Sequence, residues 1–245
     1  MQKEDRKSYI DSIGIDYLLC HTDMGNKIYI LKNGQKYKKL CPDYSDLRIK
    51  INRNFKASLL EQTEEYGHSI VSFPERIIAS DKWLSGIVSD FEVGDKLKDI
   101  PLELEVDYLL YIIGLLEEGT EDISLKGWVF EDLHEENILI NLETEEKPVR
   151  IIDTDFYLKE PSNDAIVLLQ NYKDNMARIF DAIMTAVLPR VDKSTIWNDP
   201  TIQQAYHKAI SGEMKCSDFL KILLVKIKHN QQTNKTIMTL RKSLY

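Results

Sequence analysis

With 245 residues, 43% of them hydrophobic and 29% charged, the chain has an ordinary globular composition and is long enough to bury a substantial core. Its net charge of −8 argues against a general nucleic-acid-binding surface, and its three dispersed cysteines, Cys20, Cys41 and Cys216, favour a reducing cytoplasm over a disulfide framework or a zinc site. The charged start lacks the apolar segment of a signal peptide, and the longest apolar run, residues 108–116, is too short to span a membrane.

Residues 9–50 are predicted to form strands and turns. Strands are expected at 15–20, 27–31 and 35–40. A polar turn containing Gly25 separates the first two, and Asn33-Gly34 is a strong hairpin signal between the second and the third. In the third strand, alternation places Lys38 on one face and Tyr37 and Lys39 on the other.

Residues 53–66 carry an apolar stripe at helical spacing and predict a helix that contains Glu61 and Glu64. Two more strands are expected at 75–79 and 84–89, followed by the segment Asp90-Phe91-Glu92-Val93-Gly94. Strands dominate before Gly94 and helices after it. We therefore predict two domains, residues 1–94 and 95–245.

Beyond the boundary, residues 102–118 are apolar around most of the helix circumference, which is typical of a central buried helix. Further helices are predicted at 164–188, 201–210 and 216–228. From Lys221 onward there are six Lys or Arg residues and no acids. Such a tail is typical either of a solvated helix end or of a docking site for an acidic partner.

The segment from Gly127 to Tyr157 organises the chain. Two apolar runs, 138–140 and 149–152, flank a polar stretch of turn-forming composition and predict a β-hairpin. Asp132 and Asn137 precede the first strand, and Asp153 and Asp155 follow the second, so the open end of the hairpin would bring these groups together. Carboxylate and amide oxygens at one place suit a hard cation such as Mg²⁺, especially one shared with phosphates.

This pattern resembles the protein-kinase-like superfamily. Asp132-x-x-x-x-Asn137 resembles the kinase catalytic loop, and residues 149–153 resemble the strand that leads into the D-F-G segment. The sequence Asp132-Leu133-His134 is closer to the matching segment of aminoglycoside phosphotransferases and other atypical kinases. The resemblance implies an α+β, bilobal fold with a small antiparallel-sheet N-lobe and a helical C-lobe.

The resemblance also implies roles. Asp132 would orient or deprotonate an attacking hydroxyl, and Asn137 and Asp153, with Asp155 as a less certain third ligand, would bind Mg²⁺. Lys38 would hold the ATP phosphates, with Lys39 as the alternative. Its glutamate partner would be Glu61, with Glu64 as the alternative. In addition, Gly25 would lie over the phosphates, and the backbone of Asp90, Phe91 and Glu92 would meet the adenine edge. His134 would fit either a role in the site or simple packing under the loop.

Several departures from the family pattern leave alternatives open. The glycine-rich loop is reduced to Gly25, Phe130-Glu131 replaces the usual His-Arg, and Asp153-Thr154-Asp155 replaces D-F-G. The A-P-E motif is absent. The favoured expectation is an ATP- and Mg²⁺-dependent phosphotransferase acting on a protein or small-molecule hydroxyl. A pseudokinase that binds nucleotide or serves as a scaffold, and an unrelated α+β binding protein, are the alternatives.

Overall fold

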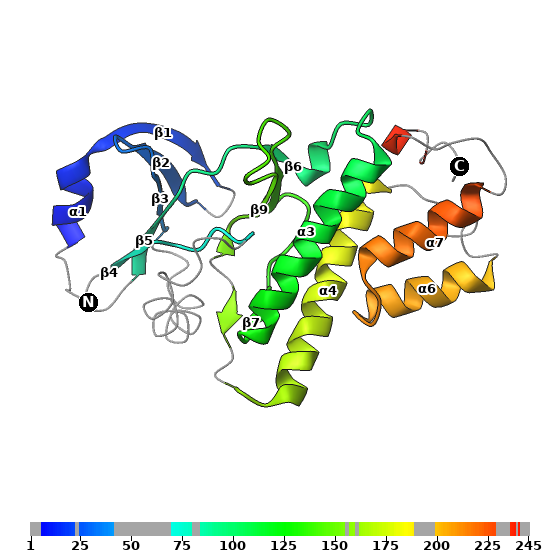
Figure 1. Ribbon diagram of the computed structural model, residues 1–245. Helices are drawn as coiled ribbons and strands as arrows, with labels where there is room; N and C mark the ends of the chain where they lie inside the picture. The colour runs from blue at the N-terminus through cyan, green and yellow to red at the C-terminus, as the bar shows by residue number, and fades with distance from the viewer. Residues whose placement is uncertain are drawn as a thin grey trace.

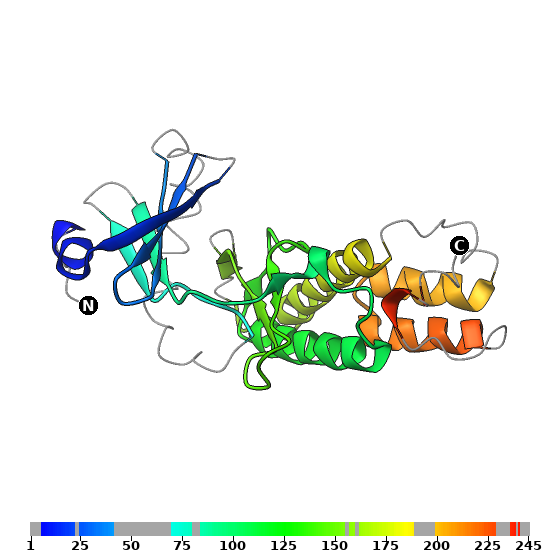
Figure 2. The same ribbon diagram turned by 90° about the horizontal axis from the view of Figure 1, so that it is seen from above.

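The computed structural model describes residues 6–22, 25–41, 70–79, 84–154, 157–159, 162–188, 199–228, 236–238 and 240. It is a mixed α+β protein in which an antiparallel sheet is followed by helices, and this level of the predicted fold class is confirmed. The sheet lies at one end of the molecule and the last two labelled helices at the other (Figures 1 and 2).

The first sheet has five strands in the order β1-β2-β3-β5-β4, all antiparallel to their neighbours. The predicted strands are confirmed to within a residue or two at their ends. Their bounds are β1 Ile15–His21, β2 Lys27–Leu31, β3 Lys36–Lys39, β4 Arg76–Ala79 and β5 Leu84–Ser89. A small apolar core made by Leu31, Tyr37, Ile78 and Val88 holds this sheet together.

Helix α1 (Arg6–Ile13) corrects the prediction that this part of the chain forms only strands and turns. Three of its side chains, Tyr9, Ile10 and Ile13, pack against the core of the first sheet. Gly14 ends the helix with a φ of 82°, and its N–H donates to the Ile10 carbonyl at 2.8 Å. A glycine in the left-handed region is a common helix end. Gly14 was therefore the feature of the sequence that could have indicated a helix ending here.

A second, three-stranded sheet lies between the first sheet and the helices (Figure 1). Its strands are β6 (Asp95–Lys96), β8 (Ile138–Ile140) and β9 (Val149–Ile151), in the order β6-β8-β9. The predicted hairpin is confirmed, with Ile138 opposite Ile151 and Ile140 opposite Val149. The other edge of β9 meets Val71 in a parallel bridge, so this strand is paired on both sides. A short ribbon of β7 (Trp128–Val129) and β10 (Leu158–Lys159) flanks the loop before β8.

The helical part contains a 3₁₀ turn, η2 (Leu97–Asp99), and helices α3 (Val106–Leu125), α4 (Ala165–Val187), α6 (Pro200–Ile210) and α7 (Cys216–Lys228). The three helices predicted after residue 160 are confirmed. Side chains from all four helices and from β8 and β9 form the main core. Within the described ranges, none of the helices has the length and apolarity needed to cross a membrane.

Helix α3 differs from the prediction of residues 102–118 at both ends. At its start, the Leu102 and Leu104 carbonyls accept the N–H groups of Met238 (2.8 Å) and Ile237 (3.0 Å), which holds residues 102–104 in a turn. At its end, the helix continues through Gly119 to Leu125. A Cβ atom at Gly119 would collide with the Ile70 side chain. This glycine therefore permits close packing inside the helix and does not end it.

Candidate functional site

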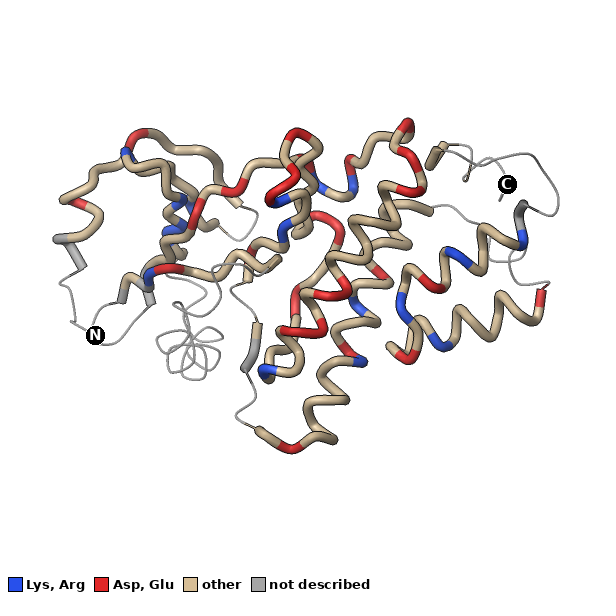
Figure 3. The backbone as a smooth tube through the Cα atoms, viewed as in Figure 1, with Lys and Arg blue, Asp and Glu red and all other residues tan. Residues whose placement is uncertain are grey.

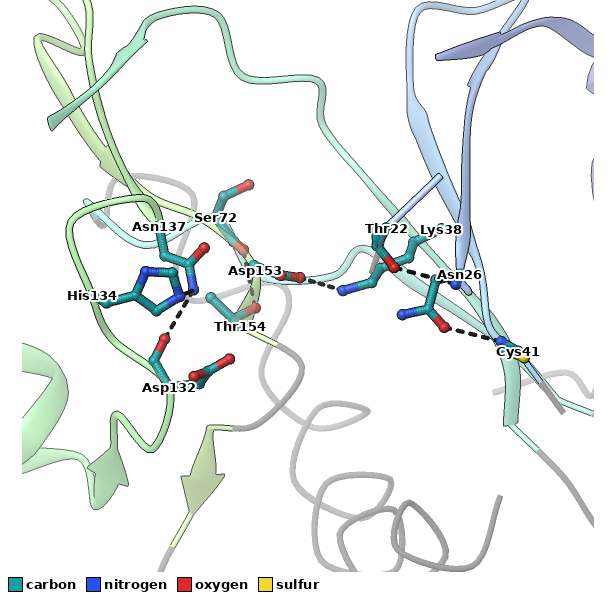
Figure 4. A network of polar contacts seen from close by, with 10 residues as sticks. All are labelled: Thr22, Asn26, Lys38, Cys41, Ser72, Asp132, His134, Asn137, Asp153 and Thr154. Carbon is teal, nitrogen blue, oxygen red and sulfur yellow. Dashed lines mark hydrogen bonds and ion pairs between the residues drawn. The ribbon is translucent and has the colours of Figure 1, made fainter. Parts of the chain in front are cut away.

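The open end of the β8–β9 hairpin brings the predicted polar residues together (Figure 4). The Asn137 carbonyl accepts the N–H of Ile152 at 2.8 Å, which joins the residue before β8 to the residue before Asp153. The Asn137 N–H in turn donates to the His134 carbonyl at 2.9 Å and tightens the loop that begins at Asp132. The pairing of the two strands therefore fixes the spacing of Asp132, Asn137 and Asp153.

The Asn137 side chain is buried and has a defined orientation. Its Nδ2 atom donates to the Asp132 carbonyl at 2.9 Å and lies 3.0 Å from Nε2 of His134. The N–H of Glu136 donates to Nδ1 of His134 at 3.3 Å. The imidazole therefore contacts the loop through both of its ring nitrogens and stabilises it. Because the amide nitrogen faces Asp132, the amide oxygen is turned away from His134, as Figure 4 shows.

Asp153 has an unusual backbone conformation. Its φ of 59° makes it the single non-glycine residue with a positive φ in the described part of the chain. Asp tolerates this left-handed region better than most residues, but the conformation still has an energetic cost and is found most often at functional sites. The next residue, Thr154, donates from its hydroxyl to the Ser72 carbonyl at 3.2 Å, which holds the turn in place.

Lys38 on β3 forms an ion pair with the carboxylate of Asp153, which lies 115 positions later in the sequence. The lysine is 5% exposed, whereas its neighbour Lys39 is exposed to solvent. Of the two lysines left open by the sequence, Lys38 is therefore the one that reaches the hairpin end (Figure 4). A buried lysine needs such a partner, because an isolated charge in the protein interior is strongly unfavourable.

Gly25 lies in the turn between β1 and β2, with a φ of 73°. Its N–H donates to the Thr22 carbonyl at 2.9 Å, and a Cβ atom in its place would lie 3.3 Å from Sγ of Cys41. The buried Asn26 accepts the N–H of Cys41 at 3.0 Å. The turn is thus tied to the end of β3, the strand that carries Lys38, as Figure 4 shows.

Residues 90–94 connect the first sheet to the second without regular secondary structure. Phe91 is 42% exposed, and the side chain of Glu92, which is 11% exposed, pairs with Nε of Arg150 on β9 at 3.2 Å. Asp90 lies close to Glu75, and burial, followed by this neighbouring carboxylate, raises the pKa of Glu75. The pair between Glu92 and Arg150 therefore fixes residues 90–94 to the same hairpin that positions Asn137 and Asp153.

Two predicted site residues, Glu61 and Asp155, lie outside the described residues, as do the predicted helix 53–66 and the alternative Glu64. In the described ranges, no group of three or more His, Cys, Asp or Glu side chains could hold a metal ion. The described oxygen atoms at the hairpin end that could bind a metal ion are those of the Asn137 amide and the Asp153 carboxylate. One or two such ligands suit Mg²⁺, which usually keeps several waters and binds substrate phosphates.

Helix α4 holds the loop before Asp132 through contacts that the sequence analysis missed. The fully buried Asn175 accepts the N–H of Phe130 and donates to the Trp128 carbonyl and the Ser124 hydroxyl, each at 2.8 Å. One turn later, Arg178 donates to the Glu131 carbonyl at 2.7 Å. The feature of the sequence that could have indicated this network is an asparagine at helical spacing from Ile179 and Ile183, which are buried on the same helix.

The opposite side of the loop is held by charge. Glu136 pairs with Lys98 at 2.8 Å and with Lys96 at 3.1 Å, and these two contacts lower the pKa of its carboxyl to about 2. The pairs link β6 and η2 to the residue next to Asn137. Since all three side chains are partly exposed, they orient the loop more than they stabilise the fold.

The predicted basic tail is only partly described. Lys221 pairs with Asp218 at 3.2 Å and Lys226 with Asp199 at 2.9 Å, so both lysines already have acidic neighbours. Along the described chain, Lys and Arg are interspersed with Asp and Glu (Figure 3).

The arrangement places one buried cation from the first sheet against the Asp153 carboxylate at the end of the hairpin, while Asn137 and Asp132 lie on the loop that enters the hairpin. Such a site can hold a negatively charged group together with a hard cation. The chain matches no family profile, and no curated protein gives a significant sequence match to it.

Proposed function

We propose that this protein is an ATP- and Mg²⁺-dependent phosphotransferase of atypical kinase-like type. The acceptor would be a hydroxyl group of a protein or of a small molecule. The observation that carries the proposal is the ion pair between Lys38 and Asp153. It joins the first sheet to the end of the hairpin on which Asn137 and Asp132 also lie.

The chemistry follows from what phosphoryl transfer requires, namely positioned phosphates, neutralised charge and an aligned nucleophile. Lys38 would bind the α- and β-phosphate oxygens. Asn137 Oδ1 and the Asp153 carboxylate would hold Mg²⁺, which offsets the phosphate charge when bound. Asp132 would accept the proton of the attacking hydroxyl. At the same time the hydroxyl oxygen bonds to the γ-phosphorus, and the bond between the γ-phosphorus and the ADP oxygen breaks. These roles need one cation and three oxygen-bearing side chains at one place.

A two-lobed reading of the fold is part of the proposal. The five-stranded sheet would be the N-lobe, the helices with the hairpin the C-lobe, and residues 90–94 the hinge that meets the adenine. The pairing of Glu92 with Arg150 supports a hinge of defined position. So does Gly94, where a Cβ atom would lie 2.8 Å from the Ile140 carbonyl oxygen, so that the segment runs directly over β8.

A module that binds nucleotide without turnover is the second candidate. Gly25 is the lone glycine of the β1–β2 turn, and the direct pair between Lys38 and Asp153 occupies the groups that the phosphates and metal would use. In that case the pair would persist and the nucleotide would bind weakly.

The test is Mg²⁺-dependent ATP turnover by the wild type and by Asp132→Ala, Asp153→Ala and Lys38→Met. We expect each substitution to lower kcat by about 100-fold or more. Lys39→Met is the matched control, because this exposed neighbour on the same strand is expected to keep wild-type activity. Turnover that survives Asp153→Ala would refute the proposal. Nucleotide binding without turnover in the wild type would favour the second candidate.

A further inference from the structure

Tyr157 is a fully buried residue next to the proposed site that the sequence analysis did not single out. Its side chain is 0% exposed, and its ring stacks on Phe130 with the centroids 4.7 Å apart. Its N–H donates to the Thr154 carbonyl at 3.1 Å. The residue therefore packs between the strand end that carries Asp153 and the loop that leads to Asp132.

The Tyr157 hydroxyl has no hydrogen-bond partner among the groups that the structure describes. Buried hydroxyls are almost always paired, because an unpaired one loses its hydration without compensation. Burial, and after it the charges of Asp153 and Asp132, raise the pKa of this hydroxyl well above its usual range. A neutral tyrosine hydroxyl is a hydrogen-bond donor, and the stacking on Phe130 places this ring beside the loop that leads to Asp132.

The carboxylate of Asp132, in turn, lacks a hydrogen-bond donor among the described groups. Its backbone carbonyl accepts Nδ2 of Asn137, but within the described ranges no group donates to its side-chain oxygens. Asp153, in contrast, already accepts from Lys38. In Figure 4 the interactions drawn reach the main chain of Asp132 and the side chain of Asp153. Among the described groups, the Tyr157 hydroxyl thus has no acceptor and the Asp132 carboxylate has no donor.

We propose that Tyr157 is a positioning residue for Asp132, whose carboxylate accepts its hydroxyl directly or across one water molecule. This inference rests on the proposed phosphotransferase function. Held through one oxygen, the carboxylate keeps its other oxygen directed at the hydroxyl of the acceptor. Because the hydroxyl has no partner among the described groups, we expect this contact to form when metal, nucleotide and acceptor are in the site.

Tyr157→Phe tests the inference, because it removes one oxygen atom and keeps the stacked ring. A hydrogen bond to a charged group supports an expected loss of about ten- to a hundredfold in kcat, with KM for ATP nearly unchanged. The melting temperature should stay the same or rise by roughly 2–4 °C, because an unpaired buried hydroxyl is removed. Tyr108→Phe, at a half-buried tyrosine on α3, is the matched control and should keep wild-type kinetics.

A second measurement separates positioning from packing. In an Asp132→Asn background the same Tyr157→Phe change should cause little further loss of residual activity, because the two groups act through one contact. Wild-type kcat in Tyr157→Phe, a full additional loss in the Asp132→Asn background, or a melting temperature lowered by several degrees would each overturn the inference. Absence of Mg²⁺-dependent turnover in the wild type would instead remove the proposed function, and this inference with it.

Discussion

Asn175 offers the sharpest test of how the candidate site is built, and the test needs no assumption about function. The residue is fully buried on α4, and its amide makes three hydrogen bonds of 2.8 Å to the chain around β7. Asn175→Ala removes all three and leaves the Phe130 N–H, the Trp128 carbonyl and the Ser124 hydroxyl without this partner.

The expected cost follows from those three groups. A hydrogen bond contributes about 1 kcal/mol net, and a buried group left unpaired costs about 1–3 kcal/mol. Asn175→Ala should therefore lower the free energy of unfolding by roughly 3–5 kcal/mol. For a chain of this size the melting temperature would fall by roughly 6–20 °C.

Urea unfolding followed by circular dichroism measures this change, and Asn171→Ala is the matched control. Asn171 lies one turn earlier on the same helix and is 5% exposed, but its amide nitrogen has no hydrogen-bond partner in the described structure. Its substitution should change the free energy of unfolding by no more than about 1 kcal/mol. Equal losses in the two variants, or a loss below about 1 kcal/mol in Asn175→Ala, would refute the reasoning.

Two further predictions concern the helical part. Gly212→Ala should lower the free energy of unfolding by about 2–4 kcal/mol in the same assay, because φ is 69° and a Cβ atom would collide with the Lys173 carbonyl. Gly34→Ala is the control. Gly34 has a φ of 85° but nothing within 4 Å of the added Cβ atom, so this substitution should lower the free energy of unfolding by only about 1 kcal/mol. Glu117 accepts the Ser217 N–H and hydroxyl at 2.9 and 2.6 Å, and burial raises its pKa in the folded chain. Because the folded state then holds this proton more tightly than the unfolded state, the resulting stability is present at low pH and is lost as pH rises through the raised pKa. Wild-type stability should fall relative to Glu117→Gln across that window, and a difference independent of pH would contradict the assignment.

Local signals in the sequence were sufficient for most strands and for three helices. The hairpin at 138–151 was predicted because its apolar runs and polar turn are contiguous, and its pairing then placed Asp132, Asn137 and Asp153 together. The choice of Lys38 over Lys39 needed the resemblance, since alternation alone allowed either residue. The structure brings Lys38 to Asp153, although the functional role of the pair stays a prediction.

The misses come from contacts distant in sequence. The start of α3 depends on hydrogen bonds from residues 237 and 238, and its passage through Gly119 depends on Ile70. Neither effect appears in the helical periodicity of residues 102–118. Similarly, the support that Asn175 gives to the loop before Asp132 spans 45 positions to Phe130. Hydrophobic periodicity and turn signals depend on residues that are close together in the sequence. The contacts of Gly119, Asn175 and residues 237 and 238 depend instead on how distant elements pack.

The double pairing of β9 limits how the site can move. The N–H of Ile151 donates to Ile70 and that of Ile152 to Asn137, both at 2.8 Å, so the residues before Asp153 are bonded on opposite sides. The strand therefore cannot slide or tilt without breaking both bonds. Any reorientation of the Asp153 carboxylate must come from rotation about its own backbone and side-chain bonds, starting from φ 59°. On the hairpin side, release of Lys38 would then be a local rearrangement of Asp153 and not a displacement of a whole segment.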